Sequence, residues 1–514
     1  MTIDRALVDR LFKHLSVQAG APTRDVIAPF TGQRLFALPL SDESDVEASV
    51  QTLRRAQTSW AARPLADRTR IMLRFHDLVL ANREEGLDIV QWETGKARRD
   101  AMEELVDVML NARHYARDAK RLLAPRRHRG VFPVATGVVQ LQHPKGVVGV
   151  MAPWNYPLTL AASDVLPALI AGNAVLLKPD VQTTLTSLWA VDLMVRAGVP
   201  ESVIRVVTGA GAVVGPMVTD RVDYVMFTGS TRVGRGIAAR CGERLIGCSL
   251  ELGGKNAMII REDADIDRAA EIATRACFSN AGQLCISMER MYVHEAVFDD
   301  FVAAFIPRVA ALRMVPEVGW AGDMGSLTSQ RQLDMVVNHV GDAVAKGATV
   351  LTGGRARPDI GPFYFEPTVL TGTTDAMSLC AEETFGPVVS LYPVSSDEEA
   401  VRRSNDTVYG LNAAVITRDT AMGRTIAATL RAGTVNINEA YGSAWGSTRS
   451  PMGGMGDSGL GRRHGDEGLL KYTESQTIAT QRVIGFGAPF GLSDERWMGT
   501  MAVALGAMKR LGLK

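Results

Sequence analysis

The chain has 514 residues, of which 46% are hydrophobic and 22% are charged. A chain of this length exceeds what one hydrophobic core normally supports, so we expect two or three domains. Its 56 basic residues balance its 56 acidic residues, which argues against a nucleic acid or an acidic surface as a partner held by bulk charge. A small molecule is the better default ligand.

Cysteine use and hydropathy bear on the compartment. The five cysteines, at positions 241, 248, 277, 285 and 380, are odd in number and lack the paired close spacings of a zinc site or a disulfide framework. We therefore expect no metal and a reducing, cytoplasmic location. Segment 1–17 carries charges among its apolar residues, unlike a secretory signal. No stretch reaches the roughly 18 to 20 apolar residues of a membrane-spanning helix.

In chain order, helices come first. Between about 41 and 124 apolar residues recur every three or four positions, which predicts a helical region. Two short β-runs follow within 137–153, and strands then alternate with helices to about 260. A second alternating series runs from about 265 to 438. Alternation of this kind predicts an α/β fold with two domains, each built on a mostly parallel sheet.

The end of the chain combines three segments of different character. A glycine-dense loop at 450–465 precedes a final strand region at 469–483. The last segment, 494–514, is apolar and ends in basic residues, so an interfacial membrane helix is one interpretation. Its weak amphipathicity and few cations favour instead a helix that docks on its own protein or on a neighbouring subunit.

Two segments place reactive side chains at bends. FSNAGQLCISMER, at 278–290, puts Cys285 after an Asn-Ala-Gly bend, where the thiol is either apolar filling or a nucleophile. MAPWNYP, at 151–157, ends an apolar strand with Asn155 between two prolines, at the sheet edge where ligands collect. The Asn155 amide either donates hydrogens to a developing oxyanion or completes the turn.

Three further segments add candidate groups. LELGGK sets Glu251 between leucines, where a carboxylate is a salt-bridged filler or a base with a raised pKa. Lys178, at a strand end, can reach a ribose hydroxyl or a phosphate, or can be solvated. FTGSTRVGRG, at 227–236, puts glycines and hydroxyls between a strand and a helix, where backbone N–H groups and the helix dipole attract phosphate. It does not match the phosphate-loop spacing.

Eight motifs together carry a family resemblance. APWNYP, LLKP, FTGST, LELGGK, FSNAGQLC, EETFGP, NDTVYGLNA and SPMGGMGDSGLGR occur in the order and at roughly the intervals of the aldehyde dehydrogenase superfamily. The resemblance covers about residues 46–483, and within the superfamily the chain is most similar to bacterial, actinobacterial-type, NADP-dependent succinate-semialdehyde dehydrogenases. It implies an α/β, aldehyde dehydrogenase-like fold. The expected parts are a Rossmann-like cofactor domain (1–121 and 143–250), a catalytic domain (251–440), an oligomerisation β-flap (122–142 and 470–486) and a C-terminal tail helix (487–514).

The resemblance also assigns roles to individual residues. It implies that Cys285 is the nucleophile, Glu251 the general base and Asn155 the oxyanion donor. The cofactor contacts that we expect are Trp154, Asn155, Lys178, Pro179, Asp180, Val181, Gly229, Ser230, Thr231, Gly234, Leu252, Glu383 and Phe385. Many NAD-preferring relatives carry a glutamate at the position of Val181, where it repels a 2′-phosphate. We therefore predict that NADP is accepted and preferred, with NAD as the second cofactor.

The residues expected to bind the substrate differ from those of some relatives. Some succinate-semialdehyde enzymes clamp the substrate carboxylate with two arginines, and here those positions are Ser163 and Ser279. Arg449 is an alternative clamp, or it faces solvent. The full set of pocket candidates is Tyr156, Thr159, Ser163, Ser279, Leu284, Ile286, Met288, Tyr441, Trp445 and Arg449. The loop also departs from the common form PFGGxKxSGxGRE at Met452, Gly456 and Arg463, which predicts altered substrate entry or subunit contact.

We predict an NAD(P)-dependent enzyme that oxidises an aldehyde to its carboxylate through a Cys285 thiohemiacetal and thioester. Succinate semialdehyde is the nominal substrate, and the expected assembly is a homodimer or homotetramer without nucleic acid. The mostly aromatic and aliphatic pocket suits a broad range of uncharged aldehydes equally well. Acyl transfer to coenzyme A is disfavoured because Glu251 would compete as a hydrolytic base. A non-catalytic nucleotide- or aldehyde-binding protein on the same scaffold is the alternative of another class.

Overall fold

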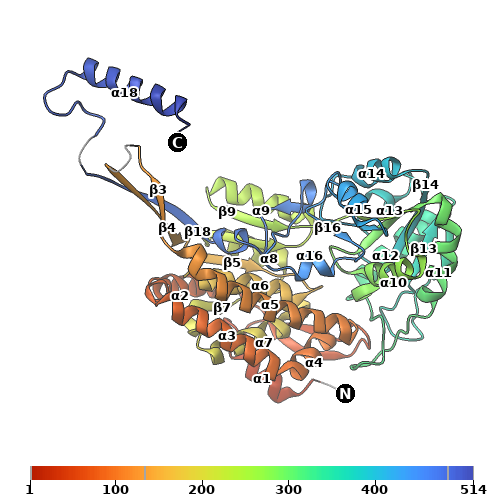
Figure 1. The fold of residues 1–514 in the computed structure, drawn as a ribbon. Helices are drawn as coiled ribbons and strands as arrows, with labels where there is room; N and C mark the ends of the chain where they lie inside the picture. Colours follow the sequence, from red (N-terminus) through yellow and green to blue (C-terminus); the bar gives the residue numbers. More distant parts are fainter. Residues whose placement is uncertain (1–2, 132–134, 483–484, 513–514) are drawn as a thin grey trace.

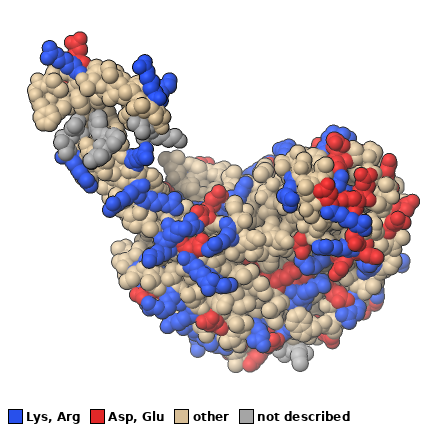
Figure 2. Space-filling view, in the orientation of Figure 1, with Lys and Arg blue, Asp and Glu red and all other residues tan. Residues whose placement is uncertain are grey.

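A computed structural model describes residues 3–131, 135–482 and 485–512. Figure 1 shows two α/β bodies side by side and an arm that projects from the first of them. Small parts of the predicted cofactor domain, flap and tail fall at 1–2, 132–134, 483–484 and 513–514, and these lie outside the described residues. Figure 2 shows cationic and anionic side chains interspersed over the visible face of both bodies.

The first body begins with helices, as the spacing of apolar residues predicts. They are α1 (Arg5–Phe12), α2 (Glu43–Ala62), α3 (Leu65–Ala81), α4 (Arg83–Thr94) and α5 (Arg98–Leu123), with the hairpin β1 (Thr23–Ile27) and β2 (Arg34–Pro39) between the first two. A capping box fixes the start of α2, because Asp42 and Asp45 each accept the other's backbone N–H. The helices of the first body therefore come largely from the segment 41–124.

A six-stranded sheet forms the centre of the first body. Its order is β17-β9-β8-β5-β6-β7, with β5 (Val147–Met151), β6 (Ala174–Lys178), β7 (Ile204–Val206), β8 (Tyr224–Thr228), β9 (Gly247–Glu251) and β17 (Gly459–Leu460). All neighbours are parallel except β17, which runs antiparallel to β9. The helices in this part are α6 (Pro157–Ile170), α7 (Thr184–Ala197), α8 (Gly211–Thr219) and α9 (Thr231–Glu243). Every residue of β5 and β6 is buried, as expected for parallel strands covered on both faces.

The sixth strand differs from the expected layout. We predicted a loop at 450–465, but β17 lies within it and pairs with β9 at Gly459 and Glu251. This pairing covers the edge of β9, which would otherwise leave backbone groups unpaired. It also brings the glycine-rich loop, far away in sequence, next to Glu251.

A seven-stranded sheet forms the second body. Its order is β12-β13-β14-β11-β10-β15-β16, with β10 (Asn256–Ile260), β11 (Met288–His294), β12 (Thr349–Thr352), β13 (Thr368–Thr371), β14 (Val388–Val394), β15 (Asn412–Ile416) and β16 (Thr434–Ile437). Only the β12–β13 pair is antiparallel. The helices are α10 (Ile266–Phe278), α11 (Phe298–Ala310), α12 (Gln330–Ala345), α13 (Ser378–Ala381), α14 (Asp397–Asn405), α15 (Thr420–Ala427) and α16 (Gly442–Gly446). This body has its own core, which includes the stacked rings of Phe278, Phe301 and Phe305.

Short elements complete the connections. The 3-10 helices are η1 (Val181–Thr183), η2 (Glu201–Val203), η3 (Ser279–Gly282), η4 (Glu295–Val297) and η5 (Gly456–Ser458), and the short helix α17 (Glu467–Leu470) precedes the last strand. In the described part of the chain, no helix combines the length and the apolar character needed to cross a membrane.

The arm is a three-stranded antiparallel sheet followed by a helix. Its order is β18-β4-β3, with β3 (Arg126–Arg129), β4 (Thr136–Pro144) and β18 (Thr473–Gln481). Helix α18 (Asp494–Arg510) follows, has no buried residue, and stands away from both bodies in Figure 1. The helix is therefore not docked on either body of its own chain, which was one of the two arrangements that the sequence predicted. Docking on a neighbouring subunit stays a prediction.

Candidate active site

Cys285 follows a strained loop between α10 and β11. Asn280, Ala281 and Gly282 all have a left-handed backbone, with φ values of 51°, 53° and 70°. Residues with a side chain rarely adopt this conformation, and it persists only where the surroundings hold it. A Cβ atom on Gly282 would lie 2.0 Å from the carbonyl oxygen of Gly386, so only glycine fits. The loop therefore has one well-defined path to Cys285.

Buried hydrogen bonds hold this loop from several sides. The backbone N–H of Asn280 donates to Asp100 Oδ2 at 2.8 Å. Gln283 Nε2 donates to the carbonyl oxygen of Ser326 at 3.3 Å, and Gln283 Oε1 accepts the N–H of Thr328 at 2.9 Å. Because these partners lie on α5 and on the segment before α12, the loop is fixed between the two bodies.

Asn155 lies against the same loop. Its Nδ2 donates to the carbonyl oxygen of Gln283 at 3.1 Å, and its own carbonyl oxygen accepts from Asn280 Nδ2 at 3.0 Å and from Lys96 Nζ at 2.7 Å. The side-chain amide carries two hydrogens, and the bond to Gln283 uses one of them. The turn after β5 and the loop before Cys285 are therefore one hydrogen-bonded unit.

Glu251 reaches this unit through two glycines. It ends β9, and the chain continues through Gly253 and Gly254 to β10. A Cβ atom on Gly254 would lie 2.8 Å from the carbonyl oxygen of Cys285, so this close approach requires glycine. Asn256 Nδ2 then donates to that same oxygen at 2.7 Å.

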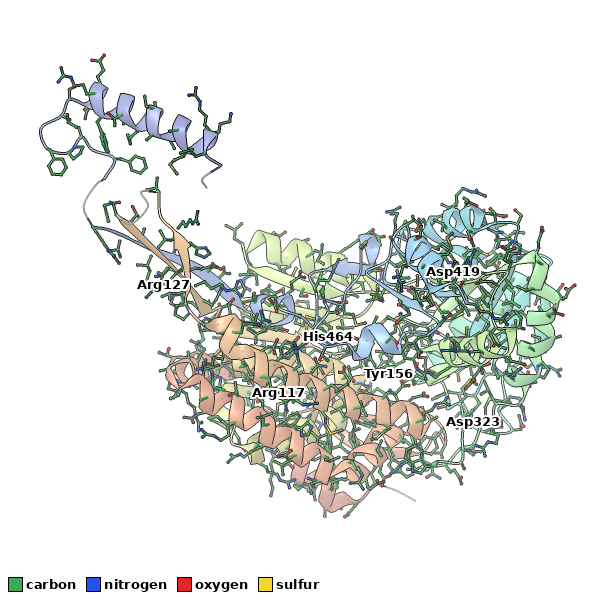
Figure 3. The ribbon with its side chains drawn as sticks, viewed as in Figure 1. Arg117, Arg127, Tyr156, Asp323, Asp419 and His464 are labelled. Atoms are coloured by element: carbon green, nitrogen blue, oxygen red, sulfur yellow. The ribbon has the colours of Figure 1, made fainter. Side chains whose placement is uncertain are left out.

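One cavity contains all three predicted catalytic side chains. Asn155, Glu251 and Cys285 line it together, although they come from a turn, a strand end and a loop that lie far apart in sequence. The lining also includes Tyr156 and His464, which Figure 3 places in the middle of the molecule between the two bodies. The structure therefore brings the thiol, the carboxyl and the amide to one place.

Burial and nearby charges raise the pKa values of both Glu251 and Cys285, but to different extents. Burial raises the pKa of the Glu251 carboxyl to about 7, against the opposing charge of Arg463. Burial, assisted by the nearby carboxyls of Glu383 and Glu251, raises the pKa of the Cys285 thiol to about 12. The thiol is therefore protonated at neutral pH and needs a base to become a nucleophile. Glu251 is close to half ionised there, so it can accept a proton.

The predicted cofactor residues lie around the carboxyl edge of the first sheet. Lys178 ends β6, is buried, and donates through Nζ to its neighbour Pro179 at 3.1 Å. Burial lowers its pKa. Asp180 caps the next turn by accepting the N–H of Gln182 at 2.9 Å, and Val181 begins η1. A buried ammonium with one backbone partner retains donors for a ribose hydroxyl or a phosphate.

The start of α9 has the features of a phosphate site. Ser230 is the N-cap residue, and its side chain makes no capping hydrogen bond. A Cβ atom on Gly229 would lie 2.4 Å from the Phe227 ring, and one on Gly234 would lie 2.5 Å from the Leu252 side chain. Glycine therefore lets the chain pass closely here, and the helix N-terminus offers backbone donors. Thr231 instead donates through Oγ1 to the carbonyl oxygen of Asp457 at 2.9 Å.

An aromatic pair and an acidic residue are further predicted cofactor contacts. The Trp154 and Phe385 rings meet edge to face with 5.5 Å between their centroids. Glu383 Oε1 accepts the N–H of Gly254 at 2.9 Å. These residues fit a dinucleotide cofactor, because a buried ammonium, a helix N-terminus and an aromatic pair are groups that can contact a ribose, a phosphate and a flat ring.

The substrate pocket agrees with the predicted residues only in part. Six candidates line the cavity, namely Tyr156, Thr159, Leu284, Ile286, Tyr441 and Trp445. Four others do not. Ser163 donates to Asp107 at 2.7 Å behind the wall, Ser279 accepts from Tyr441 at 2.9 Å, and Met288 is fully buried in the core.

Arg449 is the clearest correction. Its side chain is 79% exposed, and its Nη2 atom lies 3.3 Å from Asp118 Oδ1. It is not among the cavity-lining residues. The predicted clamp on a substrate carboxylate is therefore wrong for this side chain in the structure, because the loop turns it outward to a surface partner.

Acidic residues of α5 are the main feature that the sequence analysis missed. Asp100, Glu103, Glu104 and Asp107 recur at helical spacing on the face toward the cavity. Glu103 and Asp107 line it, and burial raises the pKa of each to about 7. Four acids at i, i+3, i+4 and i+7 in a helix with a buried face could have revealed them. Leu160, Thr228, Leu411, Met452, Arg463 and His464 complete the lining.

Comparison with known proteins shows the family of this chain. Residues 17–478 match the model of the aldehyde dehydrogenase family, and the chain belongs to that family. It is 54% identical over 489 residues, covering 95% of each chain, to a Mycolicibacterium smegmatis protein named "Putative succinate-semialdehyde dehydrogenase (NADP+)". A Mycobacterium tuberculosis protein with the corresponding name, numbered 2, is 53% identical over 93% of this chain and 92% of its own.

Solved structures show the same fold. Staphylococcus aureus betaine aldehyde dehydrogenase in complex with NAD+ is 31% identical, with a TM-score of 0.87 over 94% of this chain and 98% of its own. An Escherichia coli NADP-dependent enzyme is 30% identical, with a TM-score of 0.88 over 94% of this chain and 100% of its own. The predicted aldehyde dehydrogenase-like α/β fold and enzyme class are therefore confirmed.

Proposed function

We propose that this chain oxidises an aldehyde to its carboxylate with NADP as the preferred oxidant and succinate semialdehyde as the nominal substrate. The observation that carries the proposal is the single cavity lined by Cys285, Glu251 and Asn155. The names of the mycobacterial relatives support both the substrate and the cofactor.

Catalysis begins at the thiol. Glu251 takes the Cys285 proton as the sulfur attacks the aldehyde carbon, and the carbonyl oxygen becomes an oxyanion. The Asn155 amide and the Cys285 backbone N–H donate to that oxygen, each lowering the barrier by about 3 kcal/mol. The product of this step is a thiohemiacetal on Cys285.

Lys178, the N-terminus of α9 and the Trp154–Phe385 edge would hold NADP, which when bound would supply the acceptor for the hydride of the former aldehyde carbon. Glu251 releases the proton it took from Cys285 to solvent before it acts again. Water then cleaves the thioester on Cys285: Glu251 takes one proton from the water, the oxygen attacks the thioester carbon, and the sulfur leaves as a thiolate that takes this proton from Glu251. The carboxylate product and a free thiol result.

The preference for NADP follows from position 181. A carboxylate there would lie one turn from Lys178 and would repel a 2′-phosphate, whereas Val181 carries no charge. Asp180 is committed to capping its own turn through Gln182. The ammonium of Lys178 therefore has no acidic competitor at position 181.

A second candidate function is the oxidation of a broader range of uncharged aldehydes, and the residues that line the active-site cavity favour it. Arg449 lies outside the cavity, and the predicted clamp positions Ser163 and Ser279 lie behind its wall. The cation that does line it, Arg463, is paired with Asp164. The rest is largely aromatic and aliphatic, with the α5 carboxyls beside it.

The arm and the cysteines support the proposed assembly and compartment. Eight of the nine residues of β18 are exposed, as is all of β3, so this sheet has a free face for another copy of the chain. We propose a homodimer or homotetramer formed through it. All five cysteines are free, which suits a reducing compartment such as the cytoplasm.

The test is formation of NADPH or NADH, measured by absorbance, with succinate semialdehyde, butanal and benzaldehyde, each with NADP and with NAD. Cys285→Ser should abolish turnover, whereas Cys380→Ser, a partly buried thiol outside the cavity, should retain it. Glu251→Gln should slow the steady state by about 10²-fold or more, and it should also slow the initial burst, because Glu251 takes the proton of Cys285 as well as the proton of water. An absence of NADPH with every aldehyde, or full turnover in Glu251→Gln, would contradict the proposal.

A further inference from the structure

At position 463 the glycine-rich loop differs from the common form of the family by a reversal of side-chain charge. The pattern ends Gly-Arg-Glu, and here an arginine replaces the glutamate. The structure places Arg463 in the wall of the active-site cavity, with its side chain 9% exposed. A buried guanidinium is rare unless it is paired, so its partners define its role.

Arg463 is held by an acidic residue of α6. Its Nη2 atom donates to Asp164 Oδ2 and, at 3.1 Å, to Thr228 Oγ1. Asp164 Oδ1 lies 3.4 Å from Tyr472 Oη and 3.6 Å from Lys471 Nζ. One carboxylate therefore contacts two cationic side chains inside the protein.

Glu251 shares this wall. β17 pairs with the end of β9 at Glu251, and the loop returns so that the N–H of Met452 donates to the carbonyl oxygen of Arg463 at 2.8 Å. A Cβ atom on Gly453 would lie 3.1 Å from Glu251 Oε1. The loop that carries Arg463 therefore runs directly beside the carboxyl group of Glu251.

Two complementary atoms in this wall lack partners. Among the described residues, neither the buried acceptor Glu251 Oε1 nor the buried donor Arg463 Nε has a hydrogen-bond partner. Native proteins satisfy most buried polar atoms, so each exception calls for an explanation. Here the two exceptions have opposite charge and line one cavity.

We propose that Arg463, held in place by Asp164, is a positioning residue that keeps the Glu251 carboxylate charged and oriented for hydrolysis of the thioester. This inference rests on the proposed function, in which Glu251 activates the attacking water. The altered loop residue thus acts on the hydrolytic step, in place of the change in substrate entry or subunit contact that the sequence suggested.

The charged and titratable groups around Glu251 come from five elements. Arg463 and Arg462 lie on the glycine-rich loop and Lys471 follows α17, and all three favour the ionised carboxyl. Asp164, on α6, opposes ionisation of Glu251. Cys285, His464 of the glycine-rich loop, and Glu103 and Asp107 of α5 line the same cavity. Loss of Arg463 and loss of Asp164 should therefore move the ionisation of Glu251 in opposite directions. A purely structural role would not produce opposite shifts.

The experiment follows acyl-enzyme hydrolysis without hydride transfer. With p-nitrophenyl acetate, the Cys285 sulfur displaces p-nitrophenolate to give an acetyl thioester, and water then releases acetate and the thiol. The burst reports acylation, and the steady state reports hydrolysis of the thioester, in which Glu251 activates the attacking water. The pH dependence of the steady state should have an acidic limb near 7, since only ionised Glu251 accepts the proton of water.

Four variants of the full chain are compared. Arg463→Met should shift the acidic limb up by about one pH unit, which slows hydrolysis about tenfold on that limb. Arg463→Lys keeps the charge and should restore most of the limb. Asp164→Asn keeps an acceptor for Arg463 but loses the negative charge, and should shift the limb down. Arg449→Met, an exposed arginine outside the cavity, is the control and should leave the limb unchanged.

Equal limbs in all variants, or limbs that shift the same way in Arg463→Met and Asp164→Asn, would overturn the inference. If Arg463→Met fails to fold, Arg463→Lys and Asp164→Asn still give different expectations, a limb that is nearly unchanged and a limb that is shifted down. A second readout needs no turnover: infrared difference spectra against Glu251→Gln titrate the carboxyl itself. Failure of the proposed function is distinct, because the unsubstituted enzyme would then make no NADPH from any aldehyde.

Discussion

A buried ion pair between Lys96 and Glu104 supports the turn that carries Asn155. Lys96 Nζ lies 2.6 Å from Glu104 Oε1 and 2.7 Å from the carbonyl oxygen of Asn155, and both charged side chains are fully buried. The ammonium also lies 3.8 Å from the centroid of the Tyr156 ring. Glu104 Oε2 accepts the N–H of Leu158 at 2.8 Å, at the start of α6. The pair therefore joins α5, the turn and α6.

Lys96→Met is the perturbation. It leaves the carboxylate of Glu104 buried without its cation, and breaking a buried pair from one side costs about 3–5 kcal/mol of unfolding free energy. The backbone carbonyl of Asn155 also loses one of its two donors and keeps only Asn280 Nδ2, so the amide that faces the cavity is less well positioned. We expect kcat/KM for the aldehyde to fall at least tenfold, because one oxyanion donor is worth about 3 kcal/mol.

The double variant Lys96→Met/Glu104→Gln separates charge from packing. Glutamine keeps an acceptor for the α6 backbone but carries no charge, so the double variant should recover roughly 2 kcal/mol or more of the loss relative to Lys96→Met. Urea unfolding followed by circular dichroism gives the free energies. Arg70→Met is the control, since its pair with Asp67 is largely exposed and should contribute less than about 1 kcal/mol. The single variant Glu104→Gln completes the comparison. A double variant whose loss of unfolding free energy equals the sum of the losses in Lys96→Met and Glu104→Gln would refute the reasoning.

Two further predictions concern the cofactor and the substrate. Val181→Glu should reverse the cofactor preference, because a carboxylate near the 2′-phosphate costs about 1–3 kcal/mol; kcat/KM with NADP should fall about tenfold or more while that with NAD is maintained or rises. An unchanged NADP to NAD ratio would contradict this assignment. Arg449→Ala should leave kcat/KM for succinate semialdehyde within about twofold, since the exposed guanidinium pairs with Asp118. A tenfold loss confined to the charged aldehyde would show that Arg449 reaches the substrate after all.

Local patterns in the sequence were enough for the elements and for the principal chemistry. Apolar periodicity predicted the helices between 41 and 124 and the two alternating series, because secondary structure depends on short-range spacing. Cys285, Glu251 and Asn155 were found because each stands beside glycines or prolines that mark a bend. The family resemblance then joined them, and the structure places all three in one cavity.

Tertiary structure alone decided which charges meet. Asp107, Asp164 and Arg463 lie in three segments far apart in sequence, and each is an ordinary polar residue on its own helix or loop. Their burial and pairing depend on how α5, α6 and the glycine-rich loop pack around Glu251. No local pattern gives the direction of a side chain at the end of a loop, which is why the sequence left Arg449 as either a clamp or a solvent-facing residue, and the structure places it on the surface.

The sequence by itself thus determined the fold class, the family and the reactive thiol, carboxyl and amide, since these follow from spacing and from short motifs. Only the folded chain decided the electrostatic setting of those groups and the true lining of the pocket. The physical reason is that burial and charge pairing depend on distances through space, between residues that no stretch of sequence places together.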